Sequence, residues 1–146
     1  MPPIKIMIVD DEPIIRKALK YELNSPDCTV ACGMNDDGDV RRREVRVLDT
    51  FASGPELMAA LDSPAAHEMP DYLLVDMELQ GEPTGGIFVA DRVHKKYPDI
   101  RIVILSGRFD NPHASETNRK ERILDIARVV FESLRHGAQA FVSKNA

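Results

Sequence analysis

Short apolar segments alternate with helical patterns along most of this chain. Strands are expected at residues 4–10, 44–51, 71–77, 100–107 and 138–144, and helices at residues 12–23, 53–62, 85–97 and 122–137. Apolar strands separated by helices favour a parallel sheet whose crossover helices cover both faces. The pattern therefore predicts an α/β fold with five main strands and four helices.

The size and charge of the chain limit its organisation and its partners. Its 146 residues, 43% of them hydrophobic, predict one domain over residues 1–146. A net charge of -5 argues against direct binding of this chain to nucleic acid or to a membrane surface, because both are negatively charged. The chain has neither an apolar run of about 20 residues nor a signal peptide. It is expected to be cytoplasmic.

Two segments interrupt the alternation. Apolar and polar residues alternate between residues 28 and 34, and Asp37-Gly38 follows as a turn, which predicts an added hairpin strand near residues 28–34. The polar segment 108–121 is expected to be a long loop. Cys28 and Cys32 form neither a disulfide framework nor a zinc motif, so both are expected to be reduced and partly buried.

Acidic and polar residues stand where the expected strands end. Asp10 and Asp11 follow the first main strand, and Asp76 ends the third. Ser106 ends the fourth strand and Lys144 the fifth, so all five residues should meet at one rim of a parallel sheet. Three carboxylates so close together repel one another unless cations offset their charge. We expect Mg²⁺ and Lys144 to supply that charge, in a site open enough for phosphoryl chemistry.

Four motifs in this order resemble one family. The segments IVDDE (8–12), LLVDMEL (73–79), VILSG (103–107) and GAQAFVSK (137–144) resemble the receiver domains of two-component response regulators, of the chemotaxis-regulator kind. The resemblance covers nearly the whole chain. It implies a flavodoxin-like, doubly wound, five-stranded parallel sheet with the strand order 2-1-3-4-5.

The resemblance also implies a role for each residue of the rim. Asp76 is expected to accept the phosphoryl group. Asp11 is expected to bind Mg²⁺ directly, Asp10 mainly through water, and Glu78 through its backbone carbonyl, with Asp76 completing the set. Ser106 is expected to bind the phosphoryl group and Lys144 to pair with it. Phe141 is expected to be the aromatic residue whose rotamer follows Ser106 in the switch.

The sequence departs from the family pattern at two places. Gln80 stands where the family usually has proline, and GEPTGG (81–86) lengthens the next loop, which leaves the path of that loop open. Only two residues follow Lys144, so the last helix of the fold is expected to be missing and the chain to be an excised domain. One sheet face would then be bare and apolar, so the chain is expected either to form a homodimer through that face or to be a fragment whose missing segment covers it.

The implied function is that of a phosphoacceptor. A histidine kinase or a phosphotransfer protein would donate the phosphoryl group to Asp76, Mg²⁺ would be the cofactor, and the protein would act only on itself rather than as an enzyme. DNA binding would require an output domain absent from this chain. Two alternatives stay open at this point: a Mg²⁺-dependent phosphohydrolase of the haloacid-dehalogenase or toprim kind, and a pseudo-receiver that docks a partner without being phosphorylated.

Overall fold

A computed structural model describes residues 2–63, 68–82, 85–106 and 141–143. The strands are β1 (Ile4–Val9), β2 (Thr29–Met34), β3 (Val40–Phe51), β4 (Tyr72–Asp76), β5 (Arg101–Ser106) and β6 (Phe141–Ser143). The helices are α1 (Pro13–Leu23), α2 (Gly54–Leu61) and α3 (Gly85–Lys96). The helix expected at 122–137 and the loop expected at 108–121 lie outside the described residues. None of the described helices has the length and apolar character needed to cross a membrane.

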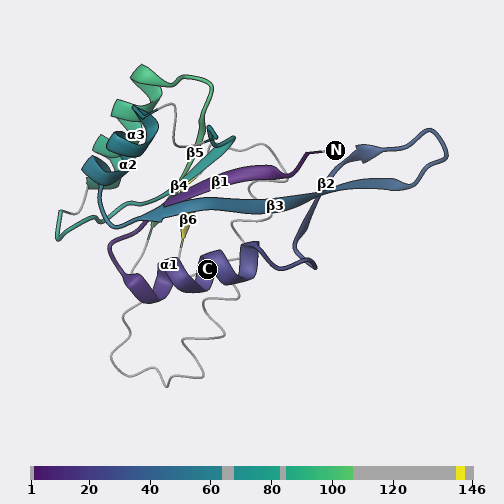
Figure 1. Cartoon of the computed structure of the whole chain (residues 1–146), viewed down its shortest axis with the longest axis horizontal. Helices are drawn as coiled ribbons and strands as arrows, with labels where there is room; N and C mark the ends of the chain where they lie inside the picture. The colour runs from purple at the N-terminus through teal and green to yellow at the C-terminus, as the bar shows by residue number, and fades with distance from the viewer. Residues whose placement is uncertain (1, 64–67, 83–84, 107–140, 144–146) are drawn as a thin grey trace.

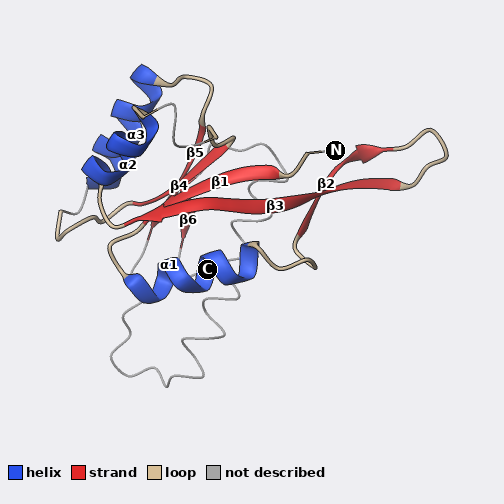
Figure 2. Ribbon diagram, viewed as in Figure 1, coloured by secondary structure: helices blue, strands red, loops and turns tan. Residues whose placement is uncertain are grey.

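The strands form one sheet in the order β2-β3-β1-β4-β5-β6. All neighbouring pairs are parallel except β2 and β3, which are antiparallel. Helix α1 covers one face, and α2 and α3 lie together on the other (Figure 1). Figure 2 shows the same layers coloured by type. Without β2 the order is that of the predicted five-stranded sheet, so the predicted α/β fold is confirmed.

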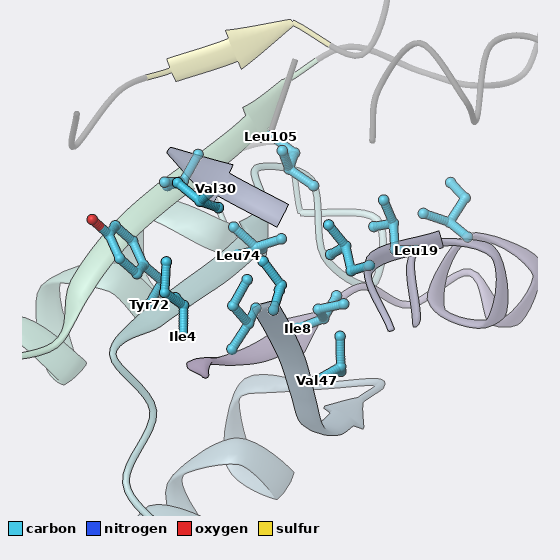
Figure 3. Packing of buried hydrophobic residues seen from close by; sticks show 13 residues of the cluster. Ile4, Ile8, Leu19, Val30, Val47, Tyr72, Leu74 and Leu105 are labelled. Atoms are coloured by element: carbon cyan, nitrogen blue, oxygen red, sulfur yellow. The ribbon is translucent and has the colours of Figure 1, made fainter. Parts of the chain in front are cut away.

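Alternate residues of the central strand β1 belong to two separate hydrophobic cores. Ile6 and Ile8 of β1 point toward α1 and belong to the larger core, part of which is shown in Figure 3. Met7 and Val9 point toward α2 and α3 and belong to the second core. All four side chains are fully buried. Because β1 is covered on both faces, its sequence is apolar throughout instead of alternating.

The added hairpin is confirmed at the predicted place. Strand β2 pairs with the first part of β3, and the hairpin projects well beyond the rest of the sheet (Figure 1). At its tip the Asn35 N–H donates to the Asp39 carbonyl at 2.7 Å, and Gly38 takes a φ of +89° that favours glycine. Strand β3 begins at Val40, four residues before the predicted start at residue 44, because pairing with β2 extends it.

The face toward α1 is closed where it has been described. The expectation that a missing last helix leaves this face bare is wrong for these residues, because Leu74, Val103 and Leu105 are fully buried. The hairpin adds to this core, since Val30 belongs to it and Cys28 packs against it. The inserted strand thus contributes to the core of the domain.

Cys28 is a half-buried free thiol, as predicted, while the side chain of Cys32 lies outside the described part. Burial and then the Glu22 carboxylate raise the pKa of Cys28 from 9.0 to about 11. The folded state favours the neutral thiol, so this contribution to stability is complete below about pH 9 and is lost as the pH rises through about 11.

We therefore expect slow alkylation of Cys28 in the folded protein. A pKa raised by two units lowers the thiolate fraction at pH 8 by about 100-fold. Iodoacetamide should accordingly modify a Cys32→Ser variant at pH 8 roughly two orders of magnitude more slowly when folded than in urea. Intact mass would measure the rate of alkylation. Equal rates in the folded protein and in urea would show that the thiol is not shielded.

Candidate functional site

The candidate site lies at the carboxyl ends of β1 and β4. These strands are paired with Val9 beside Val75, so Asp10 and Asp76, which come next, lie beside each other. The ligand oxygens of Asp10, Asp11, Glu12 and Asp76 all lie within 4.8 Å of one another. The structure thus brings together the three predicted carboxylates and adds Glu12, which the sequence analysis did not assign to the metal site.

Two of the four carboxylates are buried. Asp10 is 0% and Asp76 4% exposed, whereas Asp11 and Glu12 are partly exposed. Carboxylate oxygens in such a group are the ligands that hard divalent cations prefer. An opening on the side of Asp11 and Glu12 would leave room for water or a phosphoryl group beside a bound ion.

The turn after β1 fixes Asp10. Its N–H donates to the carbonyl of Phe51 at the end of β3, at 3.0 Å. Its side chain accepts from the N–H of Glu12 at 2.9 Å, which shapes the turn that leads into α1. Helix α1 begins at Pro13, where a missing N–H costs no helical hydrogen bond.

Arg16 brings a positive charge to this turn. Arg16 lies one helical turn beyond Glu12. Its guanidinium donates to the backbone carbonyl of Asp10 at 2.6 Å. The sequence analysis did not identify this residue. The signal in the sequence was that Arg16 lies in the first turns of a helix that starts directly after the acids. A cation held there offsets part of the repulsion among the carboxylates.

Asp76 is fixed by the start of the loop that follows β4. The N–H of Glu78 donates to the Asp76 carboxylate at 3.4 Å, so the backbone of Glu78 lies beside the cluster. The Met77 N–H donates to the Leu105 carbonyl at 2.8 Å, and Met77 accepts from the Gly86 N–H at 2.8 Å. The first turn of α3 therefore packs directly on the backbone of the site.

The loop with the unusual Gln80 also reaches the site. Leu79 and Glu82 exchange two backbone hydrogen bonds, at 3.2 and 2.9 Å, around a turn formed by Gln80 and Gly81. Both central residues have positive φ, 54° and 78°, as in a type I′ turn. This turn directs the N–H of Gln80 to the Asp11 carboxylate at 2.9 Å. The path of the loop, which the sequence left open, is thereby established up to Glu82.

The remaining predicted residues are only partly described. Ser106 ends β5 one residue beyond Leu105, which pairs with Asp76, so its backbone reaches the same edge of the sheet. Phe141 is in β6 and pairs with Ile104. The side chains of Ser106 and Phe141, and Lys144 altogether, lie outside the described residues. Their roles therefore stay predictions.

No family model matches this chain, and no curated protein does. Among solved structures it is similar to the RcsB response regulator of Salmonella typhimurium, with a TM-score of 0.58 and 17% identity over 99% of this chain and 54% of the other. The chain spans about half the length of the full RcsB chains that it matches.

Two further structures are single receivers or short regulators. TrrA of Thermotoga maritima, solved with Mg²⁺ and beryllium fluoride, has a TM-score of 0.53 and 25% identity, covering 98% of this chain and 86% of its own. The receiver domain of NtrX from Brucella abortus has a TM-score of 0.51 and 26% identity, and the match covers 97% of this chain and 86% of the NtrX chain. These similarities confirm the resemblance seen in the four motifs: this chain has the fold of response regulator receiver domains.

Proposed function

We propose that this chain is the phosphoacceptor receiver of a two-component response regulator and that Asp76 is its phosphorylation site. The observation that carries the proposal is the group of four carboxylates at the ends of β1 and β4, within one receiver fold. Asp76 is buried at the centre of that edge, and a carboxylate is the nucleophile that the reaction requires.

The residues present fit a hard divalent cation. They offer only carboxylate and backbone oxygens, and Mg²⁺ is the ion found with TrrA. Asp11 and Asp10 would hold it, Asp10 mainly through water, with Asp76 and the carbonyl of Glu78 as the other protein ligands. When bound, Mg²⁺ would offset part of the negative charge of the carboxylates and of the phosphoryl oxygens.

The chain's own groups account for the transfer. A carboxylate oxygen of Asp76 forms the new bond to phosphorus while the bond to the imidazole nitrogen of a phosphohistidine breaks, and that imidazole leaves with the electron pair. Lys144 and Ser106 would bind the transferred oxygens. Movement of Ser106 would let Phe141 follow, which changes the packing of the surface around β5 and β6. A histidine kinase or phosphotransfer protein is the proposed donor.

Acetyl phosphate tests the proposal without a kinase. With Mg²⁺, the intact mass should increase by one phosphoryl group, and chelation of the metal by EDTA should prevent the increase, because the acidic cluster would then stay uncompensated. The release of many phosphates per protein molecule would instead favour a phosphohydrolase. An unchanged mass with Mg²⁺ present would favour a docking pseudo-receiver.

A further inference from the structure

A cavity of about 820 Å³ opens at the other end of the sheet from the carboxylates. Its lining includes the first residues of β1, β4 and β5, which are Ile4, Tyr72 and Arg101. Asp10 and Asp76 lie at the opposite ends of β1 and β4. The cavity is therefore separate from the proposed phosphorylation site, and that function gives it no role.

The inserted hairpin forms one wall of the cavity. Val30 and Ala31 of β2 and Arg43 of β3 line it. Figure 3 shows Val30, Ile4 and Tyr72 at the same end of the larger core, where the hairpin meets the beginnings of the central strands. Without the hairpin this side of the cavity would be open, so the insertion is what makes it a pocket.

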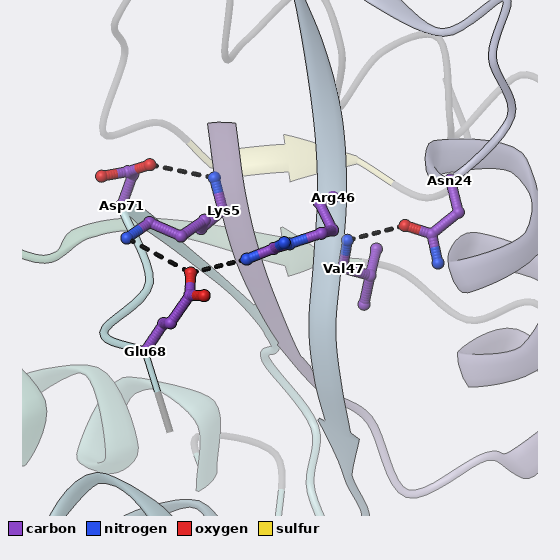
Figure 4. A network of polar contacts seen from close by, with 6 residues as sticks. All are labelled: Lys5, Asn24, Arg46, Val47, Glu68 and Asp71. Carbon is purple, nitrogen blue, oxygen red and sulfur yellow. Dashed lines mark hydrogen bonds and ion pairs between the residues drawn. The ribbon is translucent and has the colours of Figure 1, made fainter. Parts of the chain in front are cut away.

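The cavity is more basic than the protein as a whole. Among the described residues, four basic side chains and two acidic ones line it, on a chain whose net charge is -5. Two of the basic groups already have carboxylate partners. Lys96 pairs with Asp62 at 2.7 Å, and Lys5 lies 3.7 Å from Glu68, which also binds Arg46 (Figure 4).

The two guanidinium groups have only neutral acceptors. Arg43 donates through Nε to the carbonyl of Pro2 at 3.0 Å, and Arg101 donates through Nη1 to the hydroxyl of Tyr72 at 3.1 Å. Within the described part of the chain neither forms a salt bridge. Each guanidinium carries five N–H donors, so most of the donors of both side chains are available to a ligand.

Of the described residues that line the cavity, two are acidic, Asp71 and Asp99. Asp71 is held in place because its carboxylate accepts the backbone N–H of Lys5 at 2.9 Å, as Figure 4 shows. Asp99 is exposed, two residues before Arg101. With Lys5 and Lys96 paired, the two guanidinium groups and these two carboxylates balance in number, so binding of an anion would rest on the N–H donors of the two guanidinium groups and not on an excess of charge over the cavity. The guanidinium fork matches the paired oxygens of carboxylate and phosphate groups.

We infer that the inserted hairpin builds a binding site for a small organic anion, with Arg43 and Arg101 as the residues that bind its carboxylate or phosphate group. The site goes beyond phosphotransfer and does not depend on it. It would give this receiver a second input, at the end of the sheet away from Asp76.

Titration with two probes tests the inference. Inorganic phosphate and succinate should each shift the amide resonances of residues around the cavity, such as Ala31, Asp71 and Tyr97, in Mg²⁺-free buffer. Succinamide, which is uncharged, should not. The two anions distinguish the sources of the ligand, because a phosphate compound and a carboxylate compound should differ in affinity.

Three substitutions that each replace an arginine by the neutral glutamine make the test specific. Arg43→Gln and Arg101→Gln should each weaken anion binding roughly tenfold or more, because each removes charge-assisted hydrogen bonds. Arg42→Gln is the matched control: it lies on the same strand, outside the cavity, and its guanidinium donates to Thr29 at 3.3 Å. It should leave the affinity within about twofold.

Any of three results would overturn the inference. No shift with either anion would show that the cavity binds neither, and an equal loss in Arg42→Gln would show a diffuse attraction instead of a site. If Arg101→Gln does not fold, because its bond to Tyr72 is lost, Arg101→Lys takes its place. Arg101→Lys keeps the positive charge but lacks the forked N–H donors of a guanidinium group. An unchanged affinity for the anion in this variant would rule out recognition by the guanidinium group.

Discussion

Gly86→Ala is expected to destabilise the protein by about 3 kcal/mol or more, an effect at the upper end of those caused by overpacking. A methyl group on Gly86 would overlap the carbonyl oxygen of Asp76 and lie 2.7 Å from Met77 Cα. Both are backbone atoms of the segment that ends β4, so no side chain can rotate to make room. The intrinsic preference of helices for alanine over glycine, roughly 1 kcal/mol, acts in the opposite direction.

Gly85→Ala is the matched control for this prediction. It adds the same methyl group one residue earlier in α3, where the nearest atoms are Leu79 Cβ at 3.1 Å and the Leu79 carbonyl oxygen at 3.2 Å. A shift of a few tenths of an ångström would relieve that contact. Urea unfolding should therefore show a much smaller loss for Gly85→Ala. Equal losses would mean that the close approach of α3 to Asp76 is not what requires glycine.

The close approach also has a functional consequence. The Gly86 N–H bonds to the Met77 carbonyl at 2.8 Å, so a displaced α3 would move the backbone that carries Asp76. Any folded fraction of Gly86→Ala should be phosphorylated more slowly than the wild-type protein, because a carboxylate that is misplaced by a fraction of an ångström loses much of its reactivity.

The strands and the acids were predictable from the sequence because both follow from local rules. Strands buried on both faces must be apolar throughout, and parallel strands end at a common edge, which predicts that Asp10 and Asp76 lie together. The hairpin was predictable for the same reason, since alternation and an Asp-Gly turn are local signals.

Contacts that depend on the path of a loop were not predictable. Gln80 reaches Asp11 only because Gln80 and Gly81 both take positive φ, and a non-glycine residue rarely does so. Arg16 could have turned in several directions from α1, and its bond to the Asp10 carbonyl depends on the side-chain rotamer. The burial of the face beside β4 and β5 was also missed, because alternation at residues 28–34 predicts a strand but not the core to which Val30 belongs.

Asp76→Asn should abolish phosphorylation by acetyl phosphate. The amide keeps the size and shape of the side chain but has no anionic oxygen to attack phosphorus. It also removes one of the four carboxylates of the cluster, which lowers the affinity for a divalent cation. Because the substitution nearly preserves volume, the buried position should stay packed, and circular dichroism should show a folded variant.

Asp36→Asn is the control for the same change of charge. Asp36 is exposed near the tip of the hairpin, far from the cluster, so its loss should not affect the reaction (Figure 1). The most direct measurement compares the intact masses of the wild-type protein and both variants after incubation with acetyl phosphate and Mg²⁺. The account predicts one added phosphoryl group in the wild-type protein and in Asp36→Asn, and none in Asp76→Asn. An added group in the Asp76→Asn variant would contradict it.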